Sequence, residues 1–273
     1  MKIKEKLILY IKRYGHALAL GILAVGSLPP YNVLPFLFVA FSGLLILLNR
    51  QETKKQAAQL GFWFGFGFFS IGLSWVSNAF MIEGMGFEAL ASLPLIGFGL
   101  WGGLFPMTAC VIAFCFPAGV RRLIAFSAAW GIMEWVRSWL LTGFPWNLIG
   151  SVWTNWPAML QTASVWGVYG LSVVSVFVAG LPGLIKGRTA KALWPLWTVF
   201  LIMLLLAGYG LQRLKNAPEI SDTINGVRVR LVQPNIPQGK KWSKDEPASL
   251  NSVRLHLCST FFPAEYSAEP SEL

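Results

Sequence analysis

Thirteen lysines and arginines lie in alternate gaps between apolar runs, and this alternation constrains the fold more than any other feature. The N-terminal tail carries five, and the later basic gaps carry three around Gln51, two around Val120 and three around Gly187. Basic side chains are retained on the cytoplasmic side of a membrane, so the pattern predicts alternating loops and a cytoplasmic N-terminus. The gaps without lysine or arginine are 29–32, 80–88 and 142–161.

Seven apolar runs alternate with these gaps, and each is close to the ~20 residues that a helix needs to cross ~30 Å of hydrocarbon. Backbone polar groups that face lipid must be bonded within their own segment, so each run is predicted to be helical. The chain is therefore expected to be an α-helical polytopic membrane protein with about seven transmembrane helices, and residues after Leu211 are expected outside. The runs are 10–28, 33–49, 57–79, 89–115, 121–141, 162–185 and 192–211.

The composition agrees with a membrane protein, since 55% of residues are hydrophobic and 12% are charged. Soluble domains are roughly a quarter charged. A net charge of +10 would suggest nucleic acid in a soluble protein. Here the charges lie in short loops where topology explains them, so no nucleic-acid partner is expected. The three cysteines match no zinc-site spacing or disulfide framework, and neither a metal nor another cofactor is predicted.

The uncharged segment 142–157 holds three tryptophans together with proline and glycine. Indole rings favour the head-group boundary, and proline and glycine interrupt helices. The segment is predicted to be a loop in the outer interface, either as an ordinary aromatic belt or as part of a lipid-binding mouth. In the third run, Gly61, Gly65 and Gly72 are expected to let a neighbouring helix approach closely.

Glu134 and Arg137 lie three residues apart in the fifth run, so they share one helix face. Each alone would cost about 2.5–3.5 kcal/mol at mid-bilayer, which favours mutual pairing. A structural intramembrane ion pair is the first interpretation, and a role in holding substrate is the alternative.

The composition changes after Leu211. Residues 212–226 are polar and are predicted to be a linker, and 227–233 alternate apolar and polar side chains as a β-strand does. The stretch 227–273 is too short for a sizeable soluble core. It is expected to be the start of an outside α/β domain that is not completed.

Four groups of segments together resemble the apolipoprotein N-acyltransferases, bacterial inner-membrane enzymes that finish lipoprotein maturation. The resemblance covers about residues 15–257. The segments are Ser27–Asn32 with Pro35, Gly61–Gly67 with Gly72–Val76, Glu134–Arg137 with Leu141–Trp146, and Val232–Gln238 with Lys241 and Trp242.

The resemblance implies eight spans, seven before and one after a periplasmic nitrilase-like domain. It also implies that a cysteine thiolate takes an acyl chain from a phospholipid and passes it to the N-terminal diacylglyceryl-cysteine of an apolipoprotein. Trp146 and Trp242 match tryptophans of the family's Gly-Phe-Pro-Trp and Lys-Trp motifs, and the resemblance makes both candidate contacts for the lipid or its acyl chain. The implied location is the inner membrane, with the C-terminal segment periplasmic.

The sequence departs from the family where the catalytic residues should lie. The Trp-Pro-Glu-Ser and Cys-Tyr-Glu settings of the family's glutamate and cysteine are absent, and Cys258, Lys241 and Glu265 match no triad position. No catalytic residue is therefore assigned. The chain is expected to be truncated after the start of the nitrilase-like domain, with 258–273 non-native in sequence, and to be inactive alone. The alternatives are a small membrane permease and a non-catalytic membrane scaffold.

Overall fold

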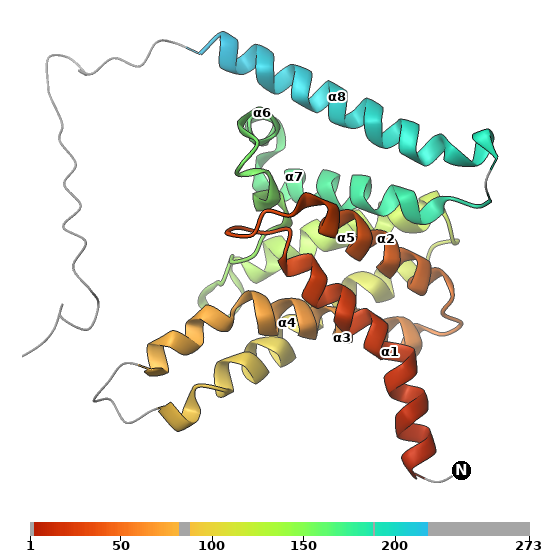
Figure 1. The fold of residues 1–273 in the computed structure, drawn as a ribbon, viewed down its shortest axis with the longest axis vertical. Helices are drawn as coiled ribbons and strands as arrows, with labels where there is room; N and C mark the ends of the chain where they lie inside the picture. Colours follow the sequence, from red (N-terminus) through yellow and green to blue (C-terminus); the bar gives the residue numbers. More distant parts are fainter. Residues whose placement is uncertain (1–2, 82–87, 188, 218–273) are drawn as a thin grey trace, which may run out of the picture. The chain divides into compact units, whose positions relative to one another are not determined.

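The computed structural model describes residues 3–81, 88–187 and 189–217, and these residues are mostly helical, with no strand among them (Figure 1). The predicted strand 227–233, Trp242, Cys258 and the expected non-native stretch 258–273 lie outside the described residues, as does most of the predicted linker.

Seven long helices coincide with the seven predicted apolar runs. They are α1 (Ile3–Val25), α2 (Leu34–Asn49), α3 (Lys54–Gly72), α4 (Leu93–Phe114), α5 (Val120–Arg137), α7 (Ala163–Gly180) and α8 (Trp194–Lys215). The short elements are α6 (Pro157–Leu160) and the 3-10 turns η1 (Ser74–Met81), η2 (Glu88–Leu90), η3 (Leu140–Thr142), η4 (Ile149–Trp153), η5 (Leu181–Leu184) and η6 (Ala190–Leu193).

Two predicted runs are interrupted earlier than their hydropathy suggests. The run 57–79 breaks after Gly72, and η1 continues at 42° to α3. The run 121–141 ends as a helix at Arg137, and further along it Leu141 and Thr142 have φ values of 52° and 75°. The α8 helix continues to Lys215, beyond the predicted boundary at Leu211.

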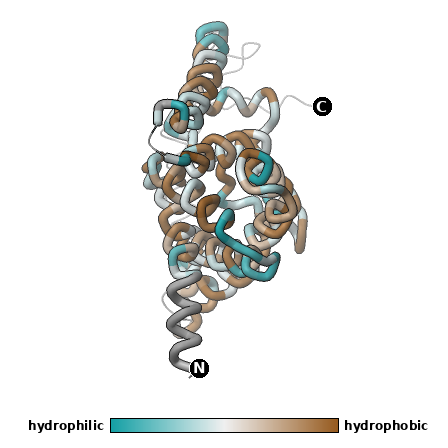
Figure 2. Tube along the Cα trace, turned by 90° about the vertical axis from the view of Figure 1, so that its right-hand side faces the viewer, coloured by the Kyte–Doolittle hydropathy of each residue, from teal (hydrophilic) through white to brown (hydrophobic). Residues whose placement is uncertain are grey.

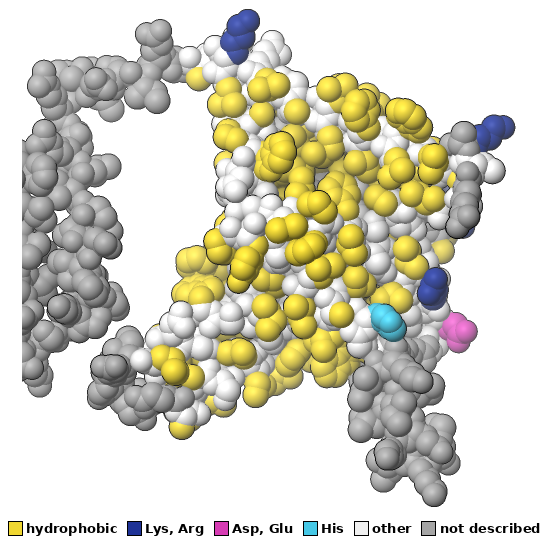
Figure 3. Space-filling model, in the orientation of Figure 1, with side chains coloured by type: hydrophobic (Ala, Val, Ile, Leu, Met, Phe, Trp, Pro, Cys, Tyr) yellow, Lys and Arg dark blue, Asp and Glu magenta, His cyan; other side chains and the backbone are white. Residues whose placement is uncertain are grey.

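Among the described residues, three helices are long and apolar enough to cross a membrane, or four if α3 and η1 form one bent span. The three are Leu93–Phe114, Ala163–Leu184 and Lys191–Lys215. Many large apolar side chains are exposed on the surface, and Figure 3 shows hydrophobic side chains across one face with charged groups at its margins. Exposed apolar surface of this extent suits contact with lipid.

The helices pack around an aromatic core. The α3 helix contacts α1 and α4, α5 contacts α4 and α7, and α8 contacts α6 and η5 (Figure 1). Trp130 on α5 meets Phe41 and Phe64 edge-on, with ring centroids 5.0 and 6.0 Å apart. Hydrophobic residues run along most of the helical trace (Figure 2), and edge-to-face contacts add to what their burial contributes.

Glycines allow α3 and α4 to approach closely, as the sequence predicts for Gly61 and Gly65. A Cβ atom on Gly65 would lie 2.8 Å from the Cα atom of Gly103, and one on Gly61 would lie 2.8 Å from that of Met107. Gly72 differs, because a Cβ there would meet the side-chain nitrogen of Asn147 instead of another helix.

Arg122 joins three helix ends. Its side chain is buried, although the sequence counts it as a loop charge, and it donates to the carbonyls of Phe116 and Leu48 at 3.1 and 3.2 Å. The start of α5 therefore lies beside the ends of α2 and α4. The α3 and α4 helices run in opposite directions, since Gly61 lies against Met107 and Gly65 lies against Gly103.

Replacing Gly65 with alanine is expected to destabilise the bundle by about 1–3 kcal/mol, because the added methyl group overlaps the α4 backbone. Gly97→Ala is the matched control, since a Cβ on Gly97 meets nothing within 4 Å. Thermal unfolding in detergent would measure both, and equal melting temperatures for the two variants would contradict the close packing.

Candidate functional site

A cavity of about 520 Å³ lies where three irregular segments meet. The segments are the connection between α1 and α2, the turn after α3, and the connection between α5 and α6. All three belong to the same end of the helices, opposite the end where Arg122 binds. The lining residues are Val25, Leu28, Pro29, Pro30, Tyr31, Gly72, Ser74, Trp75, Pro145, Trp146, Asn147, Leu148 and Ser151.

The lining is apolar and neutral. Its polar side-chain groups are the hydroxyl groups of Tyr31, Ser74 and Ser151, the amide of Asn147 and the indole N–H groups of Trp75 and Trp146, and no charged residue lines it. Ligand pockets of roughly 300–1,000 Å³ are typically apolar with a few polar groups. This cavity therefore suits an uncharged, largely apolar ligand.

Trp146, a predicted lipid contact, lines the cavity together with Trp75. Their ring centroids are 5.3 Å apart, and the two side chains are 52% and 49% exposed. Both therefore present an indole face that a ligand can reach. Contact between Trp146 and a lipid stays a prediction, and Trp242 lies outside the described residues.

The Trp146 loop (residues 144–149) is fixed to the end of α5 by Arg137. This side chain is 1% exposed, and its Nη1 donates to the carbonyl of Phe144 at 2.7 Å and to the carbonyl of Trp146. The guanidinium also lies over the ring of Phe69, with its carbon 5.0 Å from the ring centroid. Hydrogen bonds from a charged donor are stronger than neutral ones.

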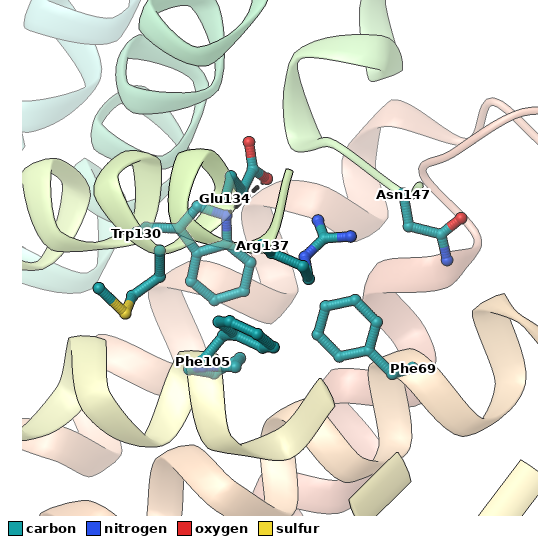
Figure 4. Close-up of a pocket in the computed structure, with 8 residues that line it drawn as sticks. Phe69, Phe105, Trp130, Glu134, Arg137 and Asn147 are labelled. Atoms are coloured by element: carbon teal, nitrogen blue, oxygen red, sulfur yellow. Dashed lines mark hydrogen bonds between the residues drawn. The ribbon is translucent and has the colours of Figure 1, made fainter. Parts of the chain in front are cut away.

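Glu134 binds the other end of the Trp146 loop. Its Oε1 accepts from the main-chain nitrogen of Ile149 and from the indole nitrogen of Trp130, each at 2.9 Å. In Figure 4, Glu134 and Arg137 project from the same helix beside Trp130. The shared face predicted for this pair is present, but the hydrogen bonds described for the two side chains go to other groups. Direct ion pairing between them stays a prediction.

A second cavity of about 10 Å³ is lined by Glu134 and Arg137 themselves, together with residues that include Phe69, Trp130 and Asn147 (Figure 4). A volume of ~10–15 Å³ is the minimum for one water molecule, so a lipid group does not fit there. Neither Glu134 nor Arg137 lines the larger cavity. Their position favours a structural role over direct contact with a ligand in that cavity.

Two serines on α7 complete the site, and sequence reasoning missed them. Ser172 Oγ accepts from the main-chain nitrogen of Gly150, and Ser175 Oγ accepts from the indole nitrogen of Trp153, each at 2.7 Å. Trp153 is buried, whereas Trp146 and Trp156 of the same segment are exposed, a difference that the sequence did not predict. The available signal was two serines three residues apart in an otherwise apolar run.

The described residues contain no group of three or more histidine, cysteine or acidic side chains that could hold a metal ion. Of the two cysteines in the described part, Cys110 is buried and Cys115 is exposed. Neither lines the larger cavity.

Comparisons with known proteins identify the family. The model of the apolipoprotein N-acyltransferase N-terminal domain matches residues 20–181. A curated apolipoprotein N-acyltransferase of Brucella melitensis is 33% identical over 264 residues, covering 92% of this chain and 48% of the relative. That of Allorhizobium ampelinum is 35% identical over 259 residues, covering 91% and 48%. That of Rickettsia typhi is 32% identical over 240 residues, covering 87% and 47%.

The chain spans about half the length of the curated relatives it matches. The matched domain includes the segments that line the larger cavity and the helix that carries Glu134 and Arg137. This chain belongs to the apolipoprotein N-acyltransferase family.

Proposed function

We propose that this chain forms the membrane-embedded, lipid-binding part of an apolipoprotein N-acyltransferase, and that the larger cavity receives an acyl chain of the phospholipid donor. The observation that carries this proposal is the neutral cavity of about 520 Å³ beside Trp146 and Trp75, in a chain of this family. Its apolar lining suits an acyl chain, and its few hydroxyl and amide groups suit the ester region. The charged phosphate would remain outside the cavity.

The proposed reaction transfers an acyl chain from phospholipid to the N-terminal diacylglyceryl-cysteine of an apolipoprotein. Family resemblance supports this reaction. The described residues place no nucleophilic cysteine at the cavity. The role proposed for this part of the chain is therefore to hold the lipid, while a thiolate nucleophile elsewhere performs the chemistry.

The proposed topology has seven spans in a bacterial inner membrane, with the N-terminus cytoplasmic and the cavity opening toward the periplasm. Two observations support it. The basic gaps containing Arg50 and Arg121 lie at the helix ends that Arg122 joins, and the uncharged segments line the cavity at the opposite ends. Retention of basic residues in the cytoplasm gives the orientation.

The proposed division of the chain is a transmembrane bundle over 1–211, a linker over 212–226 and the start of a periplasmic nitrilase-like domain over 227–273. The end of α8 at Lys215 supports a boundary near this point. The alternating pattern of 227–233 supports a strand at the start of the outside piece.

A phosphatidylethanolamine with a photoreactive group in its acyl chain should label the cavity lining in reconstituted protein. Trp146→Ala is expected to lower this labelling on the order of fivefold, because an aromatic contact with the chain is lost. Trp197→Ala is the control, since Trp197 on α8 is 69% exposed and does not line the cavity. Equal labelling of the two variants would contradict a lipid site at Trp146.

Orientation can be tested with single cysteines in a background where Cys110, Cys115 and Cys258 are replaced. Asn155 and Gly187 are both exposed and lie at opposite ends of α7. A membrane-impermeant thiol reagent should label Asn155→Cys in intact spheroplasts and Gly187→Cys only after permeabilisation. Labelling in the opposite order would refute the proposed topology.

These 273 residues, expressed in cells depleted of their own N-acyltransferase, are not expected to restore triacylation of a reporter lipoprotein. The family's glutamate and cysteine settings are absent from them. Mass spectrometry of the reporter's N-terminal peptide would measure the acyl count, with the full-length enzyme of a relative as the positive control. Restored triacylation would show that the chain has its own catalytic residues.

A further inference from the structure

We propose that Glu134 and Arg137 are positioning residues that shape the lipid cavity by binding main-chain groups of the Trp146 loop. They hold this loop so that Trp146 lies against Trp75. The clamp itself depends only on the contacts around α5. Its consequence for lipid binding rests on the function proposed above.

The need for such a clamp follows from the backbone of the Trp146 loop. This stretch leaves the helical path after Arg137, and Asn147 has a φ of 56°. Main-chain carbonyl and N–H groups there have no helical partners. An unpaired polar group costs several kcal/mol in hydrocarbon, so non-helical backbone needs protein partners.

One helix face supplies both kinds of partner. Arg137 donates to the carbonyls of Phe144 and Trp146. These two residues flank Pro145, which lines the cavity. Glu134 accepts the N–H of Ile149 at 2.9 Å and is itself held by Trp130. The donor and the acceptor thus secure the loop on both sides of Asn147. Figure 4 shows Glu134, Arg137 and Asn147 around the smaller cavity.

The clamped loop carries its aromatic side chains to defined neighbours. Phe144 stacks on Phe98 of α4, with ring centroids 5.1 Å apart, and Trp146 meets Trp75 at 5.3 Å. Residues 145–148 all line the larger cavity. Any displacement of the loop backbone therefore moves one wall of the cavity.

This role differs from that of a simple ion pair, because it depends on which of the two positions carries the donor and which carries the acceptor. A carbonyl needs a donor, and an N–H group needs an acceptor, so each side chain must keep its own position. Exchange of the two residues would keep the two opposite charges. It would, however, place a carboxylate, which can only accept hydrogen bonds, against the two carbonyls. Glu134→Gln removes one charge yet keeps an amide oxygen that can accept from Ile149 and Trp130.

The test uses the whole chain in lipid nanodiscs, labelled with 5-fluorotryptophan and observed by 19F NMR. Trp75→Phe and Trp146→Phe identify the two resonances. Arg137→Met and the exchanged variant Glu134→Arg/Arg137→Glu are expected to move both resonances, because neither variant has a donor at position 137 for the two carbonyls. Glu134→Gln is expected to move them less than either. Arg121→Met, an exposed arginine at the other end of α5, is the matched control.

Lipid capture by the photoreactive phospholipid gives the second measurement. Charge-assisted hydrogen bonds contribute enough that Arg137→Met, which removes the donor, should lower cavity labelling by ~tenfold, with a smaller loss for Glu134→Gln. Wild-type resonances in the exchanged variant, or equal effects of Glu134→Gln and Arg137→Met, would overturn the clamp. Displaced resonances with unchanged labelling would support the clamp and contradict the lipid site.

Discussion

The pairing of main-chain polar groups in an apolar surrounding is the constraint on which the rest of this structure depends. Two buried arginines, one near each end of α5, satisfy it where helices stop. Arg122 binds carbonyls of Leu48 and Phe116 at the ends of α2 and α4, and Arg137 binds carbonyls of the Trp146 loop. Because both belong to one helix, α5 fixes the connections at both ends of the bundle. These roles explain why α5 carries more polar groups than its neighbours. It is not among the three or four described helices that are long and apolar enough to cross a membrane.

The sequence predicted helix positions well because hydropathy and helix position have one cause, burial of the backbone away from water. Gly61 and Gly65 were correctly predicted to face another helix. Glycine has no Cβ atom, so its presence in an apolar run is a local signal that two helices approach closely. The breaks after Gly72 and Arg137 were not predicted. Apolar residues continue to Val76 and Leu141, so hydropathy contains no signal for a helix end there. At the first break the neighbour of Gly72 is Asn147, a residue distant in sequence.

The same limit applies to the site. Spacing alone predicted that Glu134 and Arg137 would share a helix face, but it could not reveal that their hydrogen bonds go to main-chain groups. Trp146 and Trp153 come from one uncharged segment, yet the first is half exposed and the second is buried. What separates them is Ser175, whose hydroxyl binds the Trp153 indole from α7. A partner 22 residues away leaves no mark in the local composition, so the burial of Trp153 against α7 was not predicted.

The charged side chains of Glu134 and Arg137 are kept away from the larger cavity. A charged side chain on the wall of an apolar cavity would either need a counter-charge or draw water into it, and both would oppose entry of an acyl chain. Here the lining is neutral, and the charged groups lie behind it. There Arg137 donates to main-chain carbonyls and Glu134 accepts from a main-chain N–H group. Charge in this position strengthens the bonds that hold the Trp146 loop without altering the polarity of the cavity. In the proposed lipid site, the bonds of Glu134 and Arg137 to main-chain groups would keep the non-helical wall of the cavity in place.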